Sequence, residues 1–66
     1  MNELREILDT MQVPENRKDL TEWNVNYLIR NLHFNNREHP GFDRAMELLK
    51  QESARLFRER RSNTSN

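Results

Sequence analysis

The stretch DLTEWNVNYLIRNLHF, residues 19–34, decides the fold because it is apolar on two separate faces of a helix. At 100° per residue, an arc of about 60° holds the side chains of Leu20, Trp23, Tyr27 and Phe34. A second arc of about 100°, across the helix axis, holds Val25, Leu28, Ile29 and Leu32. Both arcs need a cover if no large apolar strip is to remain in water. The sequence therefore predicts a central helix that is buried on two faces.

The N-terminal segment predicts a shorter helix over residues 3–12. Its apolar side chains recur at i, i+3, i+4 and i+7 and form one stripe of Leu4, Ile7, Leu8 and Met11. Asn2 is the expected N-cap, and Pro14 ends the helix because a proline cannot supply a helical N–H. We expect this stripe to cover the aromatic arc of Trp23 and Tyr27. The alternative is that the arc stays open as an interface.

The connections are short and polar. Residues 13–18 join two antiparallel helices, and Asp19 is the expected N-cap of the central helix, with Thr21 as a competing cap. Residues 35–41 contain two adjacent asparagines and a Pro-Gly pair, which predict a second turn. Each junction thus has its own stop and start signals.

A third helix is predicted from Pro40 or Phe42 to about Arg60. One broad stripe runs along it, formed by Phe42, Ala45, Met46, Leu49, Ser53, Leu56 and Phe57. This stripe should meet the second arc of the central helix in one core of Leu28, Ile29, Leu32, Met46, Leu49 and Leu56. The fold class is all-α: a small three-helix bundle, or a helical hairpin with an additional N-terminal helix, over residues 1–61. Residues 62–66 form a polar tail that is predicted to be disordered.

Composition narrows the class of protein. Eleven acidic and eleven basic residues cancel, and the absence of cysteine excludes disulfides and thiolate metal sites. The N-terminal residues lack the pattern of a signal peptide, and no apolar run approaches the roughly 20 residues of a membrane span. A cytoplasmic protein without a membrane segment is expected.

Residues for catalysis are poorly placed. His33, Glu38 and His39 lack the spacing of a metal site, and they are interpreted as polar surface and helix-cap residues. A phosphate-binding loop needs several glycines, whereas the chain contains one. We therefore expect no enzymatic activity, no metal and no cofactor.

A binding surface is the leading functional interpretation. Leu48 lies outside the stripe of the third helix, on a face that also carries Arg44, Gln51, Arg55 and Arg58. This face, with the aromatic pair Trp23 and Tyr27, predicts a protein-protein interaction module or small regulatory adaptor that favours an acidic partner. The alternative is a nucleic-acid-binding regulator that uses the same arginines on phosphates. A homodimer is a further possibility.

Overall fold

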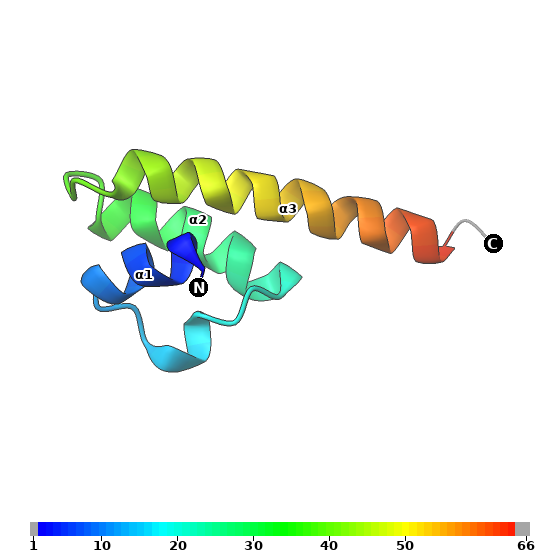
Figure 1. Ribbon diagram of the computed structural model, residues 1–66, viewed down its shortest axis with the longest axis horizontal. Helices are drawn as coiled ribbons and strands as arrows, with labels where there is room; N and C mark the ends of the chain where they lie inside the picture. Colours follow the sequence, from blue (N-terminus) through cyan, green and yellow to red (C-terminus); the bar gives the residue numbers. More distant parts are fainter. Residues whose placement is uncertain (1, 65–66) are drawn as a thin grey trace.

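The computed structural model describes the backbone of residues 2–64 and the side chains of residues 2–60. This part of the chain folds into α1 (Glu3–Thr10), the short 3-10 helix η1 (Glu15–Arg17), α2 (Glu22–Asn35) and α3 (Phe42–Thr64), and it contains no strand. The all-α class and the small helical bundle are confirmed. α3 runs the length of the molecule and packs against both α2 and α1 (Figure 1).

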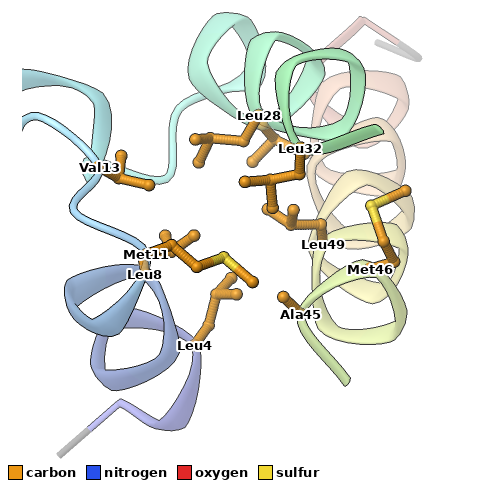
Figure 2. Close-up of a cluster of buried hydrophobic side chains, with 10 residues drawn as sticks. Leu4, Leu8, Met11, Val13, Leu28, Leu32, Ala45, Met46 and Leu49 are labelled. Carbon is orange, nitrogen blue, oxygen red and sulfur yellow. The ribbon is translucent and has the colours of Figure 1, made fainter. Parts of the chain in front are cut away.

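One hydrophobic core joins all three helices and the first connection. Figure 2 shows the buried side chains pointing toward one another from α1, α2, α3 and the loop at Val13. The fully enclosed members include Leu8 from α1, Leu28 from α2 and Leu49 from α3. The core predicted between α2 and α3 is confirmed, since Leu28, Leu32, Met46 and Leu49 are buried and Ile29 and Leu56 pack against them.

α1 lies against the start of α3, and this differs from the prediction. A Cβ atom built on Gly41 would come within 2.9 Å of Ile7 Cγ2, so only a glycine permits this approach without a shift. Leu4 and Leu8 enter the core with Leu28 and Ala45. The apolar stripe of α1 therefore packs into the core of the bundle. The expectation that it covers the aromatic arc of α2 was wrong, and so was the burial of α2 on both faces.

The helix starts follow local capping. Asn2 caps α1 as expected, because its side-chain oxygen accepts a hydrogen bond from the Leu4 N–H at 2.9 Å. At α2 the cap is Thr21, whose hydroxyl oxygen accepts from the Asn24 N–H at 3.3 Å. Asp19 was the wrong choice, since the helix begins later than its position allows.

The end of α1 is a Schellman motif with an unusual residue. The Val13 N–H bonds to the Leu8 carbonyl and the Gln12 N–H to the Asp9 carbonyl, at 3.2 and 3.1 Å. Such a motif needs a left-handed residue, and Gln12 has a φ of 59°. Glycine usually fills this position because an L side chain is strained there. The gain is that Val13 reaches the core beside Leu8.

α3 is longer than the sequence predicted. It continues to Thr64 and extends past the other helices (Figure 1), so it includes residues 62–64, which were predicted to be disordered. Residues 65 and 66 lie outside the described part of the chain. Phe57, which the stripe assigned to the core, is 60% exposed. On the helical wheel Phe57 lies about 80° from Leu49, at the edge of the stripe.

We expect Leu28→Ala and Leu49→Ala each to lower the free energy of unfolding by about 2–5 kcal/mol, because each side chain is fully enclosed and leaves a cavity. Urea unfolding followed by far-UV circular dichroism measures the change. Phe57→Ala is the control and should cost much less, since its ring is largely in water. Equal midpoints for Leu28→Ala and the wild type would contradict the core assignment.

We expect Gln12→Gly to raise the free energy of unfolding by about 0.5–1 kcal/mol. Glycine adopts the left-handed backbone conformation of position 12 without the strain that a side chain causes there. The larger conformational entropy of the unfolded glycine variant offsets part of this stabilisation. Gln12→Ala keeps a Cβ atom and should behave like the wild type. The same unfolding assay compares the three proteins, and a glycine variant no more stable than the alanine variant would refute the strain.

Candidate functional site

Arg44 forms ion pairs within the fold and is not an unpaired surface cation. Its Nε and Nη2 atoms donate to the two carboxylate oxygens of Glu3 at 2.8 and 2.9 Å, and its guanidinium also pairs with Glu47. The hydrogen bonds that Arg44 donates to Glu3 and then to Glu47 raise the pKa of Arg44, while the bond to Glu3 holds the pKa of that carboxyl below its usual value of 4.5. This bidentate pair ties α1 to α3.

The remaining residues of the predicted α3 surface are partly engaged as well. Arg55 pairs with Glu52 and, at 3.0 Å, with Glu59, and the hydrogen bond to Glu52 is the main reason for its raised pKa. Leu48 is half-buried and packs against the core, so the expectation that it projects free of the fold was wrong. Gln51 and Arg58 are exposed. Intramolecular contacts thus occupy Arg44, Leu48 and Arg55.

α2 presents the larger apolar surface to solvent. Trp23 and Phe34 are 61% and 83% exposed. At 100° per residue, both lie with Tyr27 and Arg30 in one arc of about 60°. Arg30 is exposed too, whereas Tyr27 is half-buried and packs against the core. We call these four residues the outer face of α2. Large exposed aromatic side chains gathered on one face mark interaction sites more often than single ones do.

Arg17 organises the aromatic end of the outer face. The rings of Trp23 and Tyr27 are parallel within 8°, with centroids 5.6 Å apart. The guanidinium carbon of Arg17, from η1, lies 4.5 Å from the Trp23 centroid and 4.4 Å from the Tyr27 centroid. One cation therefore interacts with both rings. η1 itself is held to α2 by Asn24, whose Nδ2 donates to the Asn16 carbonyl at 3.3 Å. Arg17 and Asn24 thus hold the two rings and η1 against each other.

Cationic side chains accompany these rings. Among the described side chains, Arg17, Arg30 and Arg37 have no carboxylate within ion-pair distance, in contrast to Arg5, Lys18, Arg44, Arg55 and Arg60. Arg30 lines two open hollows. One, of about 180 Å³, lies beside Trp23 and Tyr27, and the other, of about 690 Å³, lies beside Phe34 and Arg37. The two hollows thus bring aromatic rings and arginines together, with one carboxylate, Glu38, in the lining of the larger hollow.

The histidines do not form a metal site with their neighbours. Within the described residues, no group of three or more histidine or carboxylate side chains is arranged to hold a metal ion. His39 accepts a hydrogen bond at Nδ1 from the Gly41 N–H at 2.9 Å and so caps the start of α3, as expected. His33 packs edge-on against Phe42, with ring centroids 5.5 Å apart. Both side chains are used in the α2–α3 junction.

Sequence reasoning found part of this surface. Trp23 and Tyr27 were expected to bind a partner together with residues of α3. In the structure their neighbour is Arg17 of η1. Arg30 lies within about 20° of Trp23 on the helical wheel, a signal that could have found it. No periodic pattern places Arg17, because it reaches the rings from η1 through tertiary structure.

Comparisons of this chain with protein-family models, with curated proteins and with solved structures gave no significant match. No described helix combines the length and the apolar character that a membrane crossing requires.

We expect Glu3→Gln to lower the free energy of unfolding at neutral pH and to abolish the acid sensitivity of this contact. Because the folded pKa of Glu3 is below 4.5, the unfolded state binds its proton more readily, so the pair stabilises the fold above that pH and is lost as the pH falls through the folded pKa. The difference from the wild type should shrink below about pH 4.

Urea unfolding across this pH range measures that difference. Glu38→Gln is the matched control, because Glu38 is exposed and forms no ion pair among the described side chains. A constant gap between Glu3→Gln and the wild type at all pH values would contradict the role of the Arg44 pair.

Proposed function

We propose that this chain is a non-enzymatic protein-protein interaction module that binds its partner through the outer face of α2. The observation that carries the proposal is the exposure of Trp23 and Phe34, three helical turns apart on one face. A domain this small has little apolar surface to spare, so leaving two large rings in water is costly unless another molecule covers them. A role as a small regulatory adaptor fits such a module, and its cytoplasmic location stays a prediction.

The composition of the outer face supports a protein partner. Tryptophan, tyrosine and arginine are enriched among the residues that dominate the binding energy of protein interfaces. The two aromatic side chains bury a large area and lose few rotamers. The contact of Arg17 with Trp23 and Tyr27 already fixes two of these rings. These two side chains therefore lose less conformational entropy when a partner binds.

Single-stranded nucleic acid is the second candidate. Exposed rings beside Arg30 and Arg37, which lack a carboxylate partner among the described side chains, would suit stacked bases and phosphates. Against it, the chain has zero net charge, whereas nucleic-acid-binding domains are usually strongly basic. On α3, the arginines that were expected to bind phosphate include Arg44 and Arg55, which are neutralised by glutamates. The protein partner is favoured.

A photo-crosslinking experiment tests the surface directly. The photoreactive amino acid benzoylphenylalanine replaces Phe34 in one variant and Phe57 in a matched control, since both phenylalanines are exposed but lie on different helices. Cells that make each protein are irradiated, and adducts are separated by mass before and after nuclease treatment. We expect discrete adducts from position 34 that resist nuclease and are absent at position 57.

The outcomes separate the candidates. Adducts that shrink on nuclease treatment would move nucleic acid ahead. Adducts at position 57 but not at position 34 would place the interface on α3 and contradict the proposal. An absence of adducts at both positions would contradict it as well, because a partner seated on Phe34 must lie within reach of the photoreactive group.

A further inference from the structure

The outer face of α2 and its surroundings carry an uneven distribution of charge. Arg17, Arg30 and Arg37 have no carboxylate partner among the described side chains, while Glu22, at the start of α2, is already paired with Arg60 at 2.7 Å. A partner that covers the rings must also remove water from these guanidinium groups. Desolvating an unpaired cation is costly, so the partner has to bring anions to the same positions.

We infer that the partner is an acidic amphipathic helix of another protein, laid along α2. Its apolar side chains contact Trp23 and Phe34, and its carboxylates bind Arg30 and Arg37. The inference rests on the proposed function and adds the chemical class of the partner. An amphipathic helix on a helix face is a recurring mode of recognition, and its anchors repeat at i, i+4, i+7 and i+11.

The geometry suits a helix. Trp23 and Phe34 are about 16 Å apart along the axis at 1.5 Å per residue, so a partner helix needs about three turns to reach both rings. The two hollows lie on either side of Arg30, one beside the Trp23 and Tyr27 rings and the other beside Phe34. Side chains one or two turns apart on the partner can enter both, with a carboxylate on Arg30 between them.

A second copy of this chain is a poorer occupant. Arg30 lies near the midpoint between Trp23 and Phe34, so a two-fold axis through this face would bring Arg30 close to its own copy. Like charges in a desolvated interface oppose binding. The unpaired arginines that favour an acidic helix therefore disfavour the symmetric dimer.

A displayed peptide library provides the test. Each member is a helical peptide with leucine at i, i+4, i+7 and i+11 and with its polar positions randomised among Glu, Gln and Lys. Selection on the intact wild-type protein should enrich peptides with a clear excess of Glu over Lys. The best peptide is then titrated while the fluorescence of Trp23, the single tryptophan of the chain, reports binding.

Charge variants identify the contacts. We expect the double variant Arg30→Glu, Arg37→Glu to bind the selected peptide at least about tenfold more weakly than the wild type does. It should instead bind a peptide in which each Glu of the selected sequence is replaced by Lys. Lys50→Glu is the matched control, because Lys50 is exposed on α3 and has no ion pair among the described side chains. It should leave the affinity for the peptide unchanged.

The remaining outcomes overturn the inference in different ways. No enrichment, or enrichment without an excess of Glu, refutes the acidic helix but leaves a crosslinked partner at position 34 intact. Enriched peptides that bind Phe34→Ser as well as the wild type refute the binding surface itself. Tighter binding of a single-stranded oligonucleotide than of any selected peptide, with strong salt dependence, refutes the protein class. Dimerisation through Trp23 would refute the separate partner.

Discussion

The close approach of α1 to the first turn of α3 is the constraint on which the rest of the structure depends. Gly41 leaves room for Ile7, and Arg44 holds Glu3 across the same junction. α1 has only eight residues and one apolar stripe, so once it is placed there it cannot cover any other surface. The exposure of Trp23 and Phe34 on α2 follows from this choice of neighbour.

The sequence predicted the elements well and their docking poorly. The helix positions and the α2–α3 core follow from the periodicity of apolar residues, as Leu28 and Leu49 show. The pattern within each helix is enough to show which of its faces is buried. The position of α1 depends on a pairwise fit at Gly41, which no periodic pattern contains. Asp19 was preferred to Thr21 as the cap of α2, because the sequence does not contain the path of η1 that places Thr21 at the helix start.

The candidate site shows the same division. Trp23 and Tyr27 could be named as candidates from sequence, but their exposure could not be predicted, because large aromatic side chains are frequent in cores and in interfaces alike. The ion pairs of the arginines could not be predicted from the sequence. A helical wheel shows where Arg44 and Arg30 lie but not which of them contacts a carboxylate. The first is bound to Glu3, whereas the second has no such partner among the described side chains. The zero net charge of the chain conceals this difference between an arginine that is neutralised on α3 and arginines near the outer face of α2 that are not.

The position of Arg17 over two rings links the first connection to events on α2. In water, a cation on an aromatic face contributes about 0.5–1 kcal/mol, and the contribution rises to about 2 kcal/mol when water is excluded. A molecule that buries Trp23 and Tyr27 would therefore strengthen the hold of η1 on the bundle as it binds. Binding at the outer face of α2 and ordering of η1 are then coupled, and each favours the other by the same free energy.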